Sequence, residues 1–129
     1  MANLIVLFNH HLTDQQEQEA RERLGVRRIV HAPAEVRTIW AALPPDEDGL
    51  AASLAPVRSW LAQQATPGDF ALIQGDFGAC YLMVGHALAL GCVPLYSTTR
   101  REAREERLDD GSIRLTHHFR HVRFRNYGK

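Results

Sequence analysis

The feature that most constrains the fold is a series of short apolar runs separated by helix-prone segments. The first, Asn3–Phe8 (NLIVLF), is almost uninterrupted, as expected of a parallel strand covered on both faces. Phe70–Gln74 (FALIQ) and Cys92–Tyr96 (CVPLY) have the same character, and the more polar Val26–His31 (VRRIVH) predicts a strand nearer an edge. This alternation of strand and helix patterns predicts a parallel sheet.

The segments between the runs carry helix signals. Thr13 and Gln16 form a capping-box pattern ahead of the polar stretch Asp14–Leu24, which Gly25 is placed to end. Further helices are expected over residues 33–43, 50–61 and 79–90. The last of these is apolar on nearly every side, which predicts a buried helix.

The last thirty residues change character. Arg104–Leu108, a turn at Asp109–Gly111 and Ser112–Phe119 predict a β-hairpin, and a slip in the alternation predicts a bulge or bend near Arg120. Residues 1–129 are therefore expected to form a single α/β domain. It would be a Rossmann-like open, mainly parallel sheet with helices on both faces and a C-terminal β-hairpin.

Composition and charge narrow the function classes. Hydrophobic residues make up 45% of the chain and charged residues 23%, which is typical of globular proteins. We expect a cytoplasmic protein, because neither a secretory signal nor an apolar run long enough for a bilayer is visible. Cys80 and Cys92 lie in apolar surroundings and predict buried, reduced thiols; no metal site and no cofactor are expected.

Charge is distributed unevenly along the chain. Residues 1–99 carry six arginines and ten carboxylates, whereas residues 100–129 carry nine basic residues and five carboxylates. An anionic ligand should therefore meet the C-terminal part. The neutral total argues against binding long duplex nucleic acid, which rewards many phosphate contacts.

Ligands of open parallel sheets bind at the carboxyl ends of the strands, where three segments should converge. After the first strand, Asn9 can donate and accept hydrogen bonds, and His10 or His11 can bind a phosphate or move a proton. A polar turn capped by Asn9 explains the same residues equally well. No GxGxxG or GxxxxGK[ST] motif occurs, which disfavours dinucleotide-dependent dehydrogenases and P-loop NTPases.

The second segment is a glycine-bracketed turn. Its five residues are Gln74, Gly75, Asp76, Phe77 and Gly78. Two glycines between a strand and a helix let backbone N–H groups face an anion at the helix N-terminus. The alternative is steric, with glycines for a tight turn and Asp76 as N-cap. Asp76 is assigned a capping or hydroxyl-binding role, because it would repel a phosphate.

The third segment is the richest in donors. It consists of Ser97, Thr98, Thr99, Arg100 and Arg101. Hydroxyls and guanidiniums directly after a strand suit phosphate oxygens. The alternative is an N-cap that opens a helix over residues 100–107. Farther along, His117, His118 and His121 belong to a basic tail that is expected to line an anionic pocket or to meet a dimer partner.

These motifs together resemble a known family. NLIVLFNHxLT, QGDFGAxYLM, YSTTRR and HxFxHVRFRxY are similar to stand-alone CRISPR-associated proteins of type III systems, in or close to the CARF (CRISPR-associated Rossmann fold) group. The resemblance covers nearly the whole chain. It implies a homodimer that receives a cyclic oligoadenylate, cyclic tetra-adenylate above all, across its two-fold axis.

The resemblance also implies an activity. Ring nucleases of this class cleave the messenger without metal, through in-line attack of a ribose 2′-OH on the adjacent phosphorus. Arg100 and Arg101 would stabilise the phosphoryl charge, and His10 is the candidate acid or base. The segments above, together with His117, would bind the ligand. The alternatives are a module that binds the messenger without cleaving it, and a flavodoxin-like protein for another nucleotide or phosphosugar.

Overall fold

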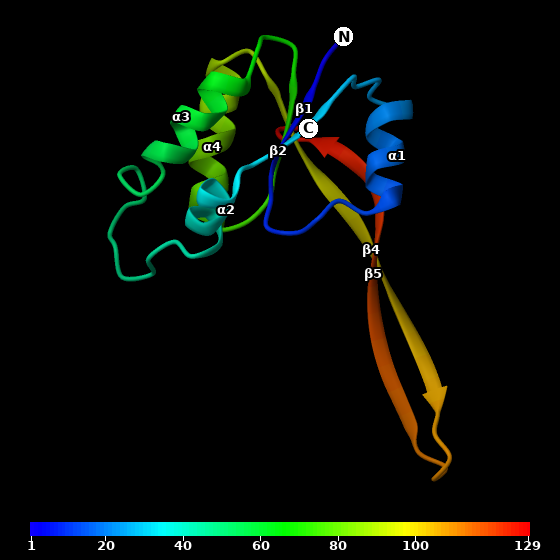
Figure 1. Ribbon diagram of the computed structural model, residues 1–129. Coiled ribbons are helices and arrows are strands. Elements are labelled where there is room, and N and C mark those ends of the chain that lie inside the picture. Colours follow the sequence, from blue (N-terminus) through cyan, green and yellow to red (C-terminus); the bar gives the residue numbers. More distant parts are fainter.

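The chain builds one five-stranded sheet with four helices, as the computed structural model of residues 1–129 shows (Figure 1). The strand order is β2-β1-β3-β4-β5, and only β4 and β5 pair antiparallel. The elements are β1 (Leu4–Leu7), α1 (Asp14–Glu22), β2 (Ile29–His31), α2 (Ala34–Ala41), α3 (Ala55–Gln64), β3 (Phe70–Ile73), α4 (Phe77–Ala89), β4 (Val93–Arg107) and β5 (Ile113–Asn126). The predicted α/β fold, with its mainly parallel sheet and C-terminal hairpin, is confirmed.

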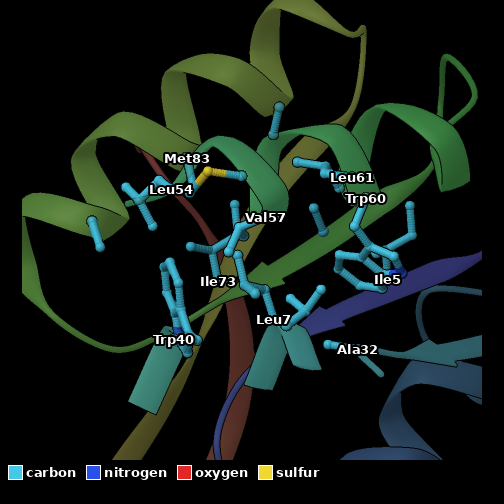
Figure 2. Close-up of a cluster of buried hydrophobic side chains, with 14 of the residues drawn as sticks. Ile5, Leu7, Ala32, Trp40, Leu54, Val57, Trp60, Leu61, Ile73 and Met83 are labelled. Carbon is cyan, nitrogen blue, oxygen red and sulfur yellow. The ribbon is translucent and has the colours of Figure 1, made fainter. Parts of the chain in front are cut away.

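Helices cover both faces of the sheet. On one face, α2, α3 and α4 pack over Ile5 and Ile73 in a cluster of 15 buried residues, which is the larger core (Figure 2). On the other face, α1 packs over Leu4 and Leu72 in a cluster of seven. Successive residues of β1 serve opposite cores because side chains alternate along a strand. This explains why all four of its residues are buried.

The start of α1 forms as its sequence indicates. Gln16 N donates to Thr13 Oγ1 (3.2 Å) and Thr13 N donates to Gln16 Oε1 (2.9 Å), so the capping box is complete. The helix ends at Glu22, two residues before the predicted Leu24, and Gly25 follows with φ of 67°. That left-handed conformation is one that glycine adopts without strain.

Two other predicted boundaries were wrong. β2 begins at Ile29, not Val26, because Val26 N donates to Ala20 O (3.1 Å) at the end of α1 and is not available to β1. The third helix begins at Ala55, with Pro56 in its first turn, and turns occupy the residues before it.

The helix predicted over residues 79–90 is present, but the prediction that it is buried was wrong. Helix α4 spans Phe77–Ala89 and buries only Ala79, Met83 and Ala87 against the sheet and α3. Phe77 and Tyr81 are 95% and 81% exposed. The helix covers one edge of its layer, so no further element packs on its outer side. None of the four helices combines the length and the apolar character that crossing a membrane requires.

The largest departure concerns β4, which was expected to end at Tyr96. It pairs with β3 only as far as Leu95 and then continues to Arg107, paired with β5 alone. The two strands project from the sheet as a ribbon (Figure 1). We call residues 99–121 the arm and the rest of the chain the body. Polar residues can stay extended there because β5 completes the ladder while water solvates both faces.

A bulge marks the junction of arm and body. Thr98 is opposite Arg123 and Thr99 is opposite His121, so Val122 is an extra residue in β5. The irregularity predicted near Arg120 is confirmed, and it lies at Val122, two residues farther along the chain. Bulges of this kind bend a strand and increase its twist.

Candidate functional site

Gln74 ties three strands together at the carboxyl edge of the sheet. Its N–H donates to Leu7 O at the end of β1 (3.2 Å), and its side-chain oxygen accepts from Ser97 N on β4 (2.9 Å). Trp40 Nε1 donates to its carbonyl oxygen (2.8 Å). Ser97 therefore lies at the edge where ligands bind in such sheets, although it is part of a strand and not of a loop.

The glycine-bracketed turn has a steric explanation. A Cβ on Gly75 would lie 2.6 Å from Trp40 Nε1, so only glycine fits there. Asp76 is the N-cap of α4, and its carboxylate accepts from Ala79 N (2.9 Å), which confirms its capping role. That carboxylate occupies the N–H that an anion would use, while Phe77 and Gly78 are exposed.

The carboxyl edge holds a partly buried chain of hydrogen bonds that joins a hydroxyl, an imidazole and a carboxylate. His121 Nε2 contacts Glu19 Oε1 (2.5 Å), and its Nδ1 contacts Ser97 Oγ. A carboxylate only accepts, so Nε2 carries a proton, and in the neutral ring Nδ1 accepts from the Ser97 hydroxyl. The His121 side chain is 4% exposed. The order of groups is that of nucleophilic serine sites with the two ring nitrogens interchanged.

Glu19 holds this chain in place. Its carboxylate accepts from Phe124 N (3.0 and 2.9 Å to its two oxygens) and forms an ion pair with Arg23 of the same helix. Burial raises the pKa of Glu19, but the hydrogen bonds from Phe124, His121 and Arg23 outweigh that effect, and the pKa falls below its usual value. The carboxylate is thus ionised and fixes the orientation of the ring.

Sequence reasoning missed Glu19 and treated His121 only as part of the basic tail. The available signal is a polar stripe on α1, where Gln16, Glu19 and Arg23 recur at helical spacing on the side of the buried Ala20. Gln16 is itself buried, and its Nε2 donates to Ser97 Oγ (3.4 Å). A polar stripe facing a sheet predicts buried polar partners on a strand.

The segment after β1 lines a separate hollow. His10 and His11, with His31 and Arg37, border a cavity of about 220 Å³, and the His10 ring packs edge-on against Phe8. His31 is exposed at the end of β2. Asn9 is also exposed and is not among the residues that line this cavity.

The other predicted residues lie on the ribbon. Thr98 Oγ1 donates to Arg123 O (2.8 Å), and Arg101 Nε donates to His117 Nδ1 (3.2 Å). Arg100 and Arg101 are consecutive in β4, so their side chains point to opposite faces of the ribbon. Thr99 is exposed beside them.

The three predicted catalytic residues are therefore not assembled within one chain. No hydrogen bond or ion pair joins His10 to Ser97, Arg100 or Arg101. The three segments do share the carboxyl edge, which is the part of the expectation that the topology supports. No group of three or more His, Cys, Asp or Glu side chains is arranged to hold a metal ion, and both cysteines are free.

Comparison with known proteins places the chain in a family. Residues 2–125 match the family described as "Uncharacterized protein MJ1673 family". A relative from Methanocaldococcus jannaschii, described as "Uncharacterized protein MJ1673", is 42% identical over 127 residues that cover 98% of each chain. No solved structure matches. The chain therefore belongs to the MJ1673 family.

Proposed function

We propose that the protein is a ring nuclease of type III CRISPR systems that binds a cyclic oligoadenylate, cyclic tetra-adenylate above all, at its carboxyl edge. The observation that carries the proposal is the chain Ser97–His121–Glu19, which orients a hydroxyl at that edge. The adjoining arginines of the ribbon supply positive charge. Adenine, the ring and the CRISPR context rest on the resemblance of the sequence motifs to the CARF group.

The hydrogen-bond chain suits a phosphoryl group. In the neutral state, His121 Nδ1 accepts a hydrogen bond from the Ser97 hydroxyl. A protonated ring donates from both nitrogens, to Glu19 and to Ser97 Oγ, and thereby frees the Ser97 hydroxyl to donate to an anion. Glu19 stabilises that protonated ring as a fixed counter-charge. His121 is a positioning residue in this scheme, and Ser97 contacts the ligand.

Cleavage would follow from holding the ribose in line. The 2′-OH attacks the adjacent phosphorus, the bond from phosphorus to the 5′ oxygen breaks, and the 2′-OH proton goes to a base, for which His10 is the candidate. The leaving 5′ oxygen takes up a proton, and the product carries a 2′,3′-cyclic phosphate. Arg100 and Arg101 would stabilise the phosphoryl charge. A two-fold dimer presents each of these residues twice to one ring, so groups that are separate within one chain can act together.

One observation favours a second function, a module that binds the same messenger without cleaving it. His10 lies in a hollow of its own and contacts neither Ser97 nor the arginines. A binding site needs no acid or base at the reacting atoms, whereas a cleaving site does.

The two functions are separated by one incubation. The purified protein is mixed with cyclic tetra-adenylate in EDTA, and products are followed by chromatography while binding is followed by calorimetry. Linear products with 2′,3′-cyclic phosphate ends support the nuclease. An intact ring that binds tightly supports the module, and absence of binding overturns both.

Variants then test the site. Ser97→Ala should lower turnover about 100-fold, the scale of one lost donor to a developing oxyanion. Arg100→Ala and Arg101→Ala should each weaken binding or turnover, whereas Arg114→Ala, the same change near the tip of the arm, should leave both unchanged. If His121 acts through Ser97, the double variant Ser97→Ala/His121→Ala should be no worse than Ser97→Ala alone. Additive losses would show that His121 has another role.

A further inference from the structure

One face of the arm carries three large apolar side chains that nothing in the chain covers, and we call it the apolar face. The cross-strand register places Ile113, Leu115 and Phe119 on this face, where they are 60%, 55% and 70% exposed. Their partners on β4 share the face and are charged: Arg107, Glu105 and Arg101. The opposite face carries charged pairs such as Arg114 with Glu106. A two-stranded ribbon alone is marginally stable in water, and an apolar face on it favours packing against another surface.

A matching apolar surface lies on the body. Phe77, Tyr81 and Leu88 form one stripe along α4 and are 95%, 81% and 59% exposed. Between this stripe and the tyrosines Tyr96 and Tyr127 is a groove of about 750 Å³, lined mainly by hydrophobic residues. The groove offers little to an anion, but it suits apolar side chains.

We propose that two copies of this chain exchange arms, so that the apolar face of each arm lies along α4 of its partner. The inference deepens the proposed function and rests on it for the pairing of two copies; it names the surfaces that join them. Exchange of this kind closes under two-fold symmetry, because each copy offers one arm and accepts one.

The topology fixes the direction of docking. The arm continues the direction of β4 past the carboxyl edge, whereas α4 begins at that edge, directly after β3, and runs back. A two-fold axis at the carboxyl edge, perpendicular to the strands, therefore lays the base of one arm at the start of the partner's α4. The arm extends over residues 99–107, roughly 30 Å at the usual rise of a strand, and α4 is roughly 20 Å long. The arm is long enough to cover the helix.

The charges at the base of the arm and at the start of α4 are opposite, which is consistent with this docking direction. At the base of the arm, the face that bears Phe119 carries Arg101 and no carboxylate, whereas Arg100, Arg104, Arg120 and Glu102 lie on the opposite face. At the start of α4, the carboxylates Glu47, Asp48 and Asp76 line an adjoining hollow of about 490 Å³. Arg101 at the base of the arm thus meets an acidic surface.

The turn at the tip of the arm is acidic. The turn carries Asp109 and Asp110, while Glu105 and Arg107 offset each other on the docked face and Glu106 pairs with Arg114 on the opposite face. Toward the end of α4, Arg58 and His86 line a shallow hollow, with the His86 ring in contact with Arg58 O (3.3 Å). The reverse direction would place the acidic tip beside Glu47, Asp48 and Asp76, where like charges repel.

Cysteine cross-linking tests the docking in the full-length chain. In a Cys80→Ala/Cys92→Ala background whose fold is checked by circular dichroism, Leu115→Cys is combined with Leu88→Cys. Mild oxidation should give a covalent dimer. Each single variant should stay uncoupled, and so should Glu106→Cys with Leu88→Cys, in which the new thiol is on the opposite face of the arm.

Three outcomes would overturn the inference. Coupling of Leu115→Cys alone indicates that arms pair with arms, and coupling of Leu88→Cys alone indicates that helices pair with helices. A chain that sediments as a monomer at all concentrations has no such interface. None of these three results bears on ligand cleavage, which is measured separately, so the docking and the proposed function can fail independently.

Affinity gives a second measure. Phe119→Ala should weaken dimerisation at least about tenfold in sedimentation equilibrium, the scale of an aromatic anchor in an interface. Thr116→Ala, on the opposite face of the arm, should change it less than about twofold. Equal effects of the two variants would contradict the assigned face.

Discussion

All four residues of β1 are buried, whereas nearly every residue of the arm between Arg100 and Arg120 is exposed, although both belong to one sheet. In the body, each strand is held by the cores on its two faces. In the arm, the strands are held by the ladder between β4 and β5 alone. The comparison shows that strand pairing extends well beyond the core that starts it, and that stability should be concentrated in the body.

The largest effect is expected from the centre of the body. Leu72→Ala removes a fully buried side chain between α1 and the sheet and should lower the free energy of unfolding by about 2–5 kcal/mol. Urea denaturation measures it. Phe119→Ala, at a dilution where the chain is monomeric, should change the value by less than about 0.5 kcal/mol. Similar losses would show that arm and body are not energetically distinct.

The junction should behave like the body. His121→Ala leaves Glu19 and Ser97 without their shared partner and should cost about 1–3 kcal/mol. Val122→Ala, one residue away on the exposed bulge, is the control and should be close to neutral. If the two variants unfold at the same urea concentration, the chain of hydrogen bonds from Ser97 to Glu19 contributes nothing to stability.

The junction should also respond to acid. The pKa of Glu19 lies below its ordinary value of 4.5 in the folded protein. Its stabilising effect is therefore present above pH 4.5 and is lost as the pH falls through the folded-state pKa. Glu19→Gln should thus be less stable than the wild type at neutral pH, with a difference that shrinks below pH 4.5. A constant difference across pH 3–7 in thermal unfolding would contradict this.

The smallest effect is expected in the arm. Glu106→Ala breaks the exposed ion pair with Arg114 and should change the free energy of unfolding by no more than about 0.5 kcal/mol. High salt should erase even that difference, since exposed pairs are screened. A salt-independent loss above 1 kcal/mol would mean that the arm is part of the cooperative unit.

The body could be predicted from its sequence because burial leaves a pattern. The runs at β1 and β3, the capping box at Thr13 and the glycine stop at Gly25 each report a local physical requirement, and the structure satisfies them. The arm could not be predicted over residues 97–103. A strand solvated on both faces has no apolar alternation, and its polar residues read equally well as a loop or a helix start.

The location of the candidate site could be predicted from the sequence, but the residues that form it could not. The order of the strands puts Ser97 at the carboxyl edge. Glu19 and His121 are 102 residues apart, and their contact depends on how α1 packs over the C-terminal strand, which no local pattern reports. The exposed stripe on α4 was misjudged for a related reason: an apolar sequence shows that a surface avoids water, and not whether its own chain or another one covers it.

The extra residue Val122 changes which face of β5 the neighbouring side chains occupy. Residues three apart in a regular strand point to opposite faces, yet His121 and Phe124 both face α1, with ring centroids 4.8 Å apart. The inserted residue inverts the alternation once, between the core and the arm. Without it, the phase that buries Phe124 would turn His121 away from Glu19. Because of the bulge, the side chains of β5 alternate in one phase within the body and in the opposite phase within the arm.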